Sequence, residues 1–309
     1  MKRIRLFRSL RNRYAFRFGK SDYARSEAKR FTRSTAGNVF FFLALLLAGL
    51  FSLLPLIYSV ATSFKPLDEL LVFPPSLVTV KRPTTANYLA IPELLSSLSV
   101  PISRYLFNGI FISAVGTGLH VVAAAMAAFV LSKTDLKYKK ALFWVIQFSL
   151  LFNGYTLAIP RYVIYAQLKI INTYWVYILP FIPSAMGVFL MKQYMDGYVP
   201  DTLLEAAHID GANWFQIFGK IVFPMVRPCV LTLVLFSFRD IWMTVPAGTV
   251  FSEQLKTLPT IMSTITAGGI ARMGSAMAAN VIIMLPTIAV YFVSQGSIRQ
   301  TMGSAGIKG

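Results

Sequence analysis

The sequence has few charged residues and almost none of the residues that form disulfides or bind metal ions. Its 309 residues include one cysteine, Cys229, and two histidines, His120 and His208. One cysteine excludes an intramolecular disulfide, and two isolated histidines form no recognisable metal-ligand pattern. Charged residues make up 14% of the chain, whereas soluble domains carry about 25%. These absences argue against a soluble protein and against a metal site.

Sequence motifs for catalysis and for nucleotide binding are also lacking. Gly219-Lys220 is not preceded by the glycine of a phosphate-binding loop and is not followed by a serine or threonine, so we expect no ATP site on this chain. No nucleophile lies near a candidate base, and most of the few carboxylates fall in loops. We therefore expect a protein that is not an enzyme and that carries no cofactor of its own.

Long apolar runs are what the sequence has in abundance, since 56% of its residues are apolar. Five runs contain no Asp, Glu, Lys or Arg, namely 34–64, 105–132, 141–160, 170–191 and 273–298. Each reaches the roughly 20 residues that a helix needs to cross a membrane, and a sixth run, 226–246, is interrupted by Arg239-Asp240. Because backbone amides must be paired within lipid, we predict an all-α membrane protein. Its transmembrane domain, 34–309, is predicted to have six spans, at about 38–60, 106–131, 141–160, 172–191, 226–246 and 276–297.

The distribution of positive charge predicts the orientation of these spans. Residues 1–33 form a basic segment with twelve Lys and Arg against two acidic residues, and the loop 133–140 has four against one. Basic loops stay in the cytoplasm, so we expect a multi-pass protein of the cell (inner or plasma) membrane with both termini cytoplasmic. This topology explains most of the net charge of +18 without nucleic acid, and the basic segment is expected to touch anionic membrane lipid.

Glycines and prolines predict how some spans pack and bend. Gly109, Gly116 and Gly118 would let the second span approach a neighbour closely. Pro180 and Pro183 predict a bend in the fourth span. His120, in the second span, is expected to be a neutral histidine bonded within the bundle; the alternative is a pore or proton site.

A helix–turn–helix is predicted between the fourth and fifth spans, on the cytoplasmic side. Asp201 is expected to cap a first helix that runs to Ile209, and Gly211 to take the left-handed conformation that closes it. Asn213 and Gln216 have the spacing of a capping box for a second helix. Pro224 is expected to break or bend that second helix near the start of the fifth span.

This loop resembles the EAA loop of binding-protein-dependent ABC importer permeases. Glu205-Ala206-Ala207, Gly211 and Pro224 have the family's spacing, with Phe223 where leucine is usual. The resemblance implies a type I ABC importer permease fold with a cytoplasmic coupling helix that docks on an ATP-hydrolysing subunit. The residues implied in coupling are Glu205, Ala206, Ala207, Asp210 and Gly211, and ATP with Mg would be held by the partner subunits. The alternative is a surface helix that packs only on its own chain.

Shorter motifs resemble the maltose-type carbohydrate permeases. Thr62-Ser63-Phe64-Lys65-Pro66, Pro74-Pro75 and Asn87-Tyr88 occur in that family's order, and the chain ends in small residues followed by Ile307-Lys308-Gly309. The segment from 62 to 88 is expected to be an ordered outer loop. The resemblance implies a sugar or oligosaccharide as cargo. It also implies a second homologous permease chain, two ATP-binding subunits and an extracytoplasmic solute-binding protein as partners.

Five residues are candidates for the substrate path: Asn108, Asn153, Tyr155, Arg239 and Asp240. A charge inside a spanning helix is expected to face the bundle interior or a water-filled cavity, and Arg239 lies about 17 Å along the helix from Pro228. The family tends to have a Trp-Asn pair near this position. We hypothesise that Arg239 meets a carboxylate of the cargo, which would favour an acidic oligosaccharide. The alternative is a neighbouring salt bridge or a latch of the outer gate.

Two other functions remain open at this point. An importer permease for a peptide, a glycerol phosphate or another non-sugar solute would have the same loop. An ion-coupled secondary transporter would need carboxylates or broken helices within the membrane. Asp240 alone supports that second reading, which would leave the EAA-like loop without a purpose.

Overall fold

The computed structural model describes residues 35–96, 100–152, 156–246, 248–269 and 272–305, and every regular element in these ranges is a helix. The basic segment 1–33 lies outside them. The helices are α3 (Thr35–Ser63), α4 (Leu67–Leu70), α5 (Ala86–Leu94), α6 (Ile102–Lys133), α7 (Lys139–Ser149), α8 (Ala158–Gln167), α9 (Trp175–Ile178), η1 (Leu179–Phe181), α10 (Ala185–Tyr198), α11 (Asp201–Ile209), α12 (Trp214–Ile217), η2 (Phe218–Val222), α13 (Phe223–Met225), α14 (Arg227–Trp242), η3 (Glu253–Leu255), α15 (Leu258–Thr266) and α16 (Met273–Ala305).

The chain divides into two compact units, Met1–Leu56 and Ile57–Gly309. The described part of the first unit belongs to α3, which continues to Ser63 and includes Pro55. Its 29 residues correspond to about 43 Å of helix, and the mean hydropathy of its most apolar window is 2.6. This helix is therefore long and apolar enough to cross a membrane, as predicted from the charge-free run.

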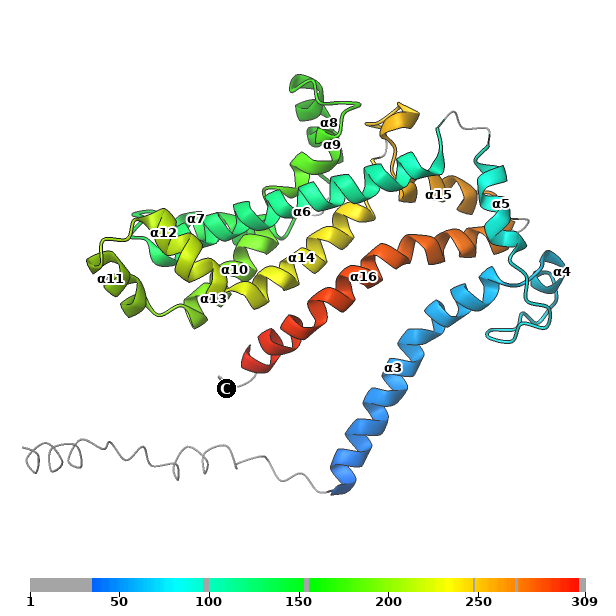
Figure 1. Ribbon diagram of the computed structural model, residues 1–309, viewed down its shortest axis with the longest axis horizontal. Coiled ribbons are helices and arrows are strands. Elements are labelled where there is room, and N and C mark those ends of the chain that lie inside the picture. Colours follow the sequence, from blue (N-terminus) through cyan, green and yellow to red (C-terminus); the bar gives the residue numbers. More distant parts are fainter. Residues whose placement is uncertain (1–34, 97–99, 153–155, 247, 270–271, 306–309) are drawn as a thin grey trace, which may run out of the picture. The chain divides into compact units, whose positions relative to one another are not determined.

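The second unit is built around α6. This 32-residue helix packs along α14 and α10, α14 packs in turn on α16, and α15 lies against α16 (Figure 1). Close approach is possible because α6 carries glycine at the contacts. A Cβ at Gly109 would lie 2.7 Å from Cζ3 of Trp242, and one at Gly116 would lie 2.9 Å from Cδ1 of Ile241. The predicted packing role of these two glycines is confirmed, whereas Gly118 faces open space.

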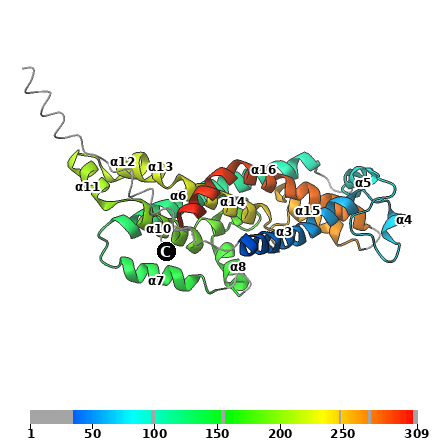
Figure 2. The same cartoon turned by 90° about the horizontal axis from the view of Figure 1, so that it is seen from below.

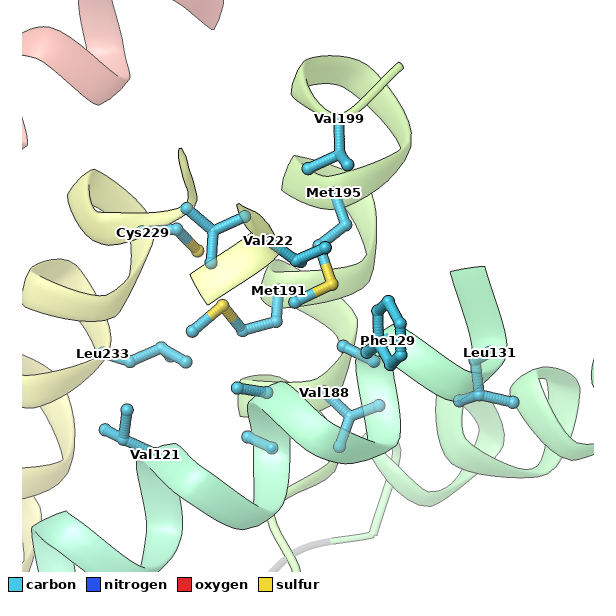
Figure 3. Close-up of a cluster of buried hydrophobic side chains, with 14 of the residues drawn as sticks. Val121, Phe129, Leu131, Val188, Met191, Met195, Val199, Val222, Cys229 and Leu233 are labelled. Atoms are coloured by element: carbon cyan, nitrogen blue, oxygen red, sulfur yellow. The ribbon is translucent and has the colours of Figure 1, made fainter. Parts of the chain in front are cut away.

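The largest apolar cluster lies where α6, α10 and α14 meet the elements that precede α14. Val121, Met191, Met195, Val222 and Leu233 are all buried within it and come from each of these segments (Figure 3). Because α11 and α12 also contribute side chains to this cluster, the end of the bundle and the helices beyond it form one packed body.

The predicted count of six spans is only partly matched. Among the described residues, four helices are long and apolar enough to cross a membrane, and a fifth span results if the bent pair Trp214–Met225 and Arg227–Trp242 is counted as one. The interval 141–160, predicted as the third span, holds parts of two helices instead, because α7 ends at Ser149 and α8 begins at Ala158. At the end of α7 the Ser149 hydroxyl donates to the Ile146 carbonyl at 2.7 Å. Such side-chain bonds compete with the backbone hydrogen bonds that would continue the helix. Pro160 sits in the first turn of α8, where proline is tolerated.

The two prolines of the fourth predicted span lie where one helical segment passes into the next, within a stretch, Trp175–Tyr198, that is long and apolar enough to be one span. Helix α9 passes into η1, which contains Pro180, and α10 starts afresh after Pro183 with Ser184 as its N-cap. The Ser184 hydroxyl accepts a hydrogen bond from the Gly187 amide at 3.0 Å. His120 lies against this break, with Nδ1 2.7 Å from the Phe181 carbonyl oxygen, so it is a buried histidine bonded within the bundle.

The segment 62–88 is ordered by bonds between its own motifs. Asn87 Nδ2 donates to the carbonyls of Ser63 and Lys65 at 2.9 and 2.8 Å. The hydroxyls of Ser63 and Tyr88 are 2.8 Å apart, and Lys65 Nζ donates to the Ser76 carbonyl. The two motifs that flank this loop therefore fix each other, which explains why they occur together.

Candidate functional site

Helix α11 begins one residue earlier than the sequence predicted. Pro200 occupies the N-cap position and Asp201 is the first helical residue, with no side-chain cap bond. The Asp201 carboxylate is used differently, because Lys133 Nζ, at the end of α6, donates to its Oδ1 at 2.8 Å and to the Val199 carbonyl at 2.7 Å. Asp201 also places a negative charge in the first turn, where the helix dipole favours it.

The turn between α11 and α12 follows the predicted chemistry. Gly211 has φ +84°, a left-handed conformation that costs glycine little. The Asn213 side chain accepts from the Gln216 amide at 2.8 Å, and the Gln216 side chain accepts from the Asn213 amide at 3.0 Å. This reciprocal pair is the predicted capping box, so the turn and the second helix are fixed by local bonds.

One face of this helix–turn–helix is attached to the bundle. Leu204 and Ile217 are buried in the main apolar cluster. The Phe129 ring of α6 lies 6.1 Å from Trp214 and 5.4 Å from Phe218, centroid to centroid. With the Lys133–Asp201 ion pair, these contacts hold α11 and α12 at the end of α6.

Other apolar side chains of this helix–turn–helix are exposed within the described part of the chain. Ile209 is 86% exposed, Phe215 79% and Leu203 40%. Glu205 and Asp210 are exposed beside them and make no ion pair with any described residue. Ala206 is exposed, whereas Ala207 is half-buried and packs against the main cluster. We call Leu203, Glu205, Ile209, Asp210 and Phe215 the outer face of the loop.

The loop leads into α14 through a sharp bend. Residues Phe218–Val222 form a π-helix, in which the Phe223 amide reaches back to the Phe218 carbonyl. Pro224 has no amide to donate, and Pro228 follows in the first turn of α14. The axes of Trp214–Met225 and Arg227–Trp242 differ by 79°, which confirms the predicted bend near Pro224.

Arg239 and Asp240 lie in the last turn of α14, and both are exposed on this chain. Neither forms an ion pair with the residues that the structure describes. The neighbouring residues Ser237, Ile241 and Trp242 are buried, so α14 turns its inner face to α6 and its charged face outward. A salt bridge within the described chain is therefore not what holds Arg239.

Asn108, predicted as a substrate-path residue, is held by hydrogen bonds within the chain. Its side chain is fully buried, and Nδ2 donates to the carbonyls of Gln254 and Lys256 at 2.8 and 2.9 Å. Its Oδ1 accepts from the Tyr174 hydroxyl at 2.9 Å. The sequence could not show this, because the partners lie 66 to 148 residues away. Asn153 and Tyr155, the remaining candidates, lie outside the described residues.

A cavity of about 370 Å³ was missed by the sequence reasoning. It lies between α8, the α9–η1 segment and the residues that follow α14, and its lining includes Arg161, Tyr162, Tyr165, Phe181, Thr244 and Thr249. The available signal was the spacing of three residues: Arg161 and Tyr162 precede Tyr165 by four and three positions, so each lies about one helical turn from Tyr165. Among the described residues no group of three or more His, Cys, Asp or Glu could hold a metal ion.

Comparison with known proteins gives consistent matches over most of the chain. Residues 120–304, more than half of the sequence, match the family model of the binding-protein-dependent transport system inner membrane component. The polygalacturonan/rhamnogalacturonan transport system permease protein YtcP of Bacillus subtilis (strain 168) is 28% identical, over 80% of this chain and 89% of its own length. The arabinooligosaccharides transport system permease protein AraQ of Halalkalibacterium halodurans is 26% identical, over 82% of this chain and 91% of its own length.

Solved structures match the fold. A crystal structure of a bacterial ABC transporter involved in the import of the acidic polysaccharide alginate contains a chain that aligns with a TM-score of 0.68 at 20% identity. The alignment covers 86% of this chain and 99% of that one. A chain from the alginate transporter in complex with an alginate pentasaccharide-bound periplasmic protein aligns with a TM-score of 0.53 at 13% identity. At these identities the likeness extends to the fold alone.

Proposed function

This chain belongs to the family of binding-protein-dependent transport system inner membrane components, and from this membership we propose that it is the permease subunit of an ATP-driven importer of sugars or oligosaccharides. As a permease it is a transport component and not an enzyme. The named cargoes of the relatives support the proposed class, since YtcP and AraQ are both described as carbohydrate transport permeases.

The proposed orientation places α11 and α12 in the cytoplasm. The loop 133–140, with four Lys and Arg, lies beside α11, because Lys133 is bonded to Asp201. Basic loops of membrane proteins stay on the cytoplasmic side. We therefore propose a multi-pass protein of the cell membrane with α8 and the segment after α14 on the outer side and both termini inside.

We propose that the outer face of the loop docks on an ATP-hydrolysing subunit. The single observation that carries this is the exposure of Ile209, Phe215 and Leu203 on an element whose other face is rigidly packed. Exposed apolar side chains that gather on one face indicate an interaction site, and an apolar helix face laid into a groove is a common recognition mode. Glu205 and Asp210, together with Ala206, Ala207 and Gly211, complete the proposed coupling element. ATP and Mg would be bound by the partner subunits.

The proposed complex has further partners. The fold matches a chain of the alginate transporter that was solved in complex with a periplasmic protein, which supports a solute-binding protein on the outer side. A second, homologous permease chain would face α14, where Arg239 and Asp240 are exposed and without an ion pair among the described residues.

We propose that Arg239 meets an acidic group of the cargo or faces its path. Guanidinium groups bind carboxylates through two parallel hydrogen bonds. The similarity to YtcP, described as a polygalacturonan/rhamnogalacturonan permease, supports an acidic oligosaccharide. An importer of a non-sugar solute is the alternative within the class. An ion-coupled transporter has less support, because the coupling element would have no partner.

Co-purification tests the proposed coupling role. An affinity-tagged chain, co-expressed with the candidate ATPase and second permease, should retain the ATPase through purification. Glu205→Lys and Ile209→Asp should each reduce the ATPase recovered per permease by about tenfold, since each places a charge in the contact. Glu93→Lys is the matched control, because Glu93 is exposed on α5 and lies on the proposed outer side. If all three variants retain the ATPase equally, the outer face of the loop is not the docking site.

A further inference from the structure

The cavity beside α8 is lined by two residues, Arg161 and Tyr165, whose polar groups have no partner among the described residues. The Tyr165 side chain is 6% exposed, and its hydroxyl oxygen is buried with no hydrogen-bond partner among the described residues. Arg161, one turn earlier on α8, forms no ion pair with any residue that the structure describes. The Tyr165 hydroxyl oxygen itself is inaccessible, so the exposed Arg161 guanidinium is the charged group that a ligand in the cavity can meet.

Arg161 and Tyr165 lie on the same side of α8. Both residues line the cavity, and α8 places them four positions apart, which is one turn of helix. Burial raises the pKa of Tyr165, and the positive charge of Arg161 partly offsets that rise. The Tyr165 ring therefore forms part of the wall beside the Arg161 guanidinium.

The rest of the lining suits a sugar ring. Tyr162, 46% exposed, and Phe181 offer aromatic faces, and Thr244 and Thr249 add hydroxyl groups. The Thr244 hydroxyl donates to the Asp240 carbonyl at 2.7 Å, so its lone pairs remain able to accept a bond from a ligand. Ligand pockets with a few convergent polar groups on an apolar wall are typical small-molecule sites, with volumes of about 300–1,000 Å³. A volume of about 370 Å³ is near the lower end, which suits one or two sugar rings rather than a long chain.

We propose that this cavity is a binding site for one acidic sugar unit of the cargo on the outer side of the permease. The Arg161 guanidinium would hold the carboxylate of a uronic acid, and the ring would lie against Tyr162. The site deepens the proposed function and rests on it. Arg239 does not line this cavity, but Thr244, five residues further along the chain and just after the end of α14, does. Cargo bound here would be close to the start of the proposed path.

The test uses the complete complex of permeases and ATPases in lipid nanodiscs. Dissociation constants are measured by saturation-transfer NMR for a disaccharide of galacturonic acid and for the neutral galactose disaccharide with the same linkage. The wild type should bind the acidic disaccharide more tightly. Arg161→Gln should weaken binding of the acidic disaccharide about tenfold or more, as expected for the loss of a charge-assisted hydrogen bond. The same variant should leave the neutral disaccharide within about twofold. Tyr162→Ala should weaken binding of both disaccharides several-fold, because it removes the aromatic face of the cavity.

The control is Lys169→Asn, which also removes one positive charge from the same outer segment. Lys169 has φ 56°, a conformation that asparagine accepts more readily than most residues, and it does not line the cavity. If Lys169→Asn weakens binding of the acidic disaccharide as much as Arg161→Gln does, the effect comes from the overall positive charge of the surface. If Arg161→Gln weakens binding of both disaccharides equally, the effect is structural. No binding by the wild type would also overturn the site.

Two further outcomes separate this inference from the proposed function. If Arg161→Gln leaves sugar binding unchanged but weakens docking of the solute-binding protein, the cavity receives a protein carboxylate and the sugar site is wrong. If no ATPase assembles with the wild-type permease, the proposed function itself fails, whatever the sugars do.

Discussion

Lys133, the last residue of α6, and Asp201, the first residue of α11, form an ion pair with Nζ and Oδ1 2.8 Å apart. The Lys133 side chain is 5% exposed, whereas that of Asp201 is 77% exposed. The pair is therefore asymmetric, with a buried lysine that also donates to the Val199 carbonyl at 2.7 Å. It joins the 32-residue helix α6 to the helix proposed to dock on the ATPase.

Removing the lysine should cost more than removing the aspartate. Lys133→Met leaves the Val199 carbonyl without its donor and should lower the free energy of unfolding by about 1–3 kcal/mol. Asp201→Asn, at an exposed position, should cost less than about 1 kcal/mol. Thermal unfolding in detergent checks the order. Equal losses would mean that the exposed ion pair, and not the buried lysine, holds α11.

Gly211 is the position in the loop that should tolerate substitution least. At φ +84°, a β-branched side chain is strained, and Gly211→Val should destabilise the turn by about 1–2 kcal/mol. Gly211→Asn should be milder, because asparagine visits this region. Transport per ATP hydrolysed, measured in proteoliposomes, should fall in the order wild type, Asn, Val. Gly219→Ala is the control, since open space surrounds Gly219. It should match the wild type.

The contact between α6 and α14 predicts a contrast among three glycines of one helix. Gly109→Ala and Gly116→Ala would place a Cβ 2.7 Å from Trp242 and 2.9 Å from Ile241. Overpacking of this kind costs about 1–3 kcal/mol. Gly118→Ala meets no atom within 4 Å and should stabilise the helix by about 0.5–1 kcal/mol. The melting temperature should therefore fall for Gly109→Ala and Gly116→Ala and rise for Gly118→Ala. A shift in the same direction for all three variants would contradict the packing account.

Arg239 predicts a difference between acidic and neutral cargo. Arg239→Gln should reduce uptake of a uronate-containing oligosaccharide by at least about tenfold, as for the loss of a charge-assisted bond. It should reduce uptake of the neutral counterpart much less. Uptake of labelled sugars by whole cells measures both. An equal loss for the two cargoes would mean that Arg239 serves a partner chain or a gate, which is the alternative already stated.

Local chemistry was the part of the molecule that could be predicted from the sequence. The capping box of Asn213 and Gln216, the left-handed Gly211 and the bend near Pro224 each depend on residues within a few positions of one another. Periodicity and charge also predicted an all-helical membrane protein. Such features are decided by short-range backbone and side-chain preferences.

Other features depend on contacts that the sequence does not reveal. Asn108 looked like a polar residue free to meet cargo, but its partners Gln254 and Lys256 come from a segment far along the chain. The break between α7 and α8 lies in a run with no charge at all, so hydropathy could not locate it. The cavity beside α8 exists only because residues after α14 fold back over Arg161 and Tyr165.

The 79° bend between Trp214–Met225 and Arg227–Trp242 decides what kind of movement α14 can receive. In a straight helix, a push on one end would arrive at the other as a translation along the axis. At this angle only about a fifth of such a displacement lies along α14, and almost all of it is directed across that helix. A movement of the loop would therefore reach α14 as a sideways push on its first turn.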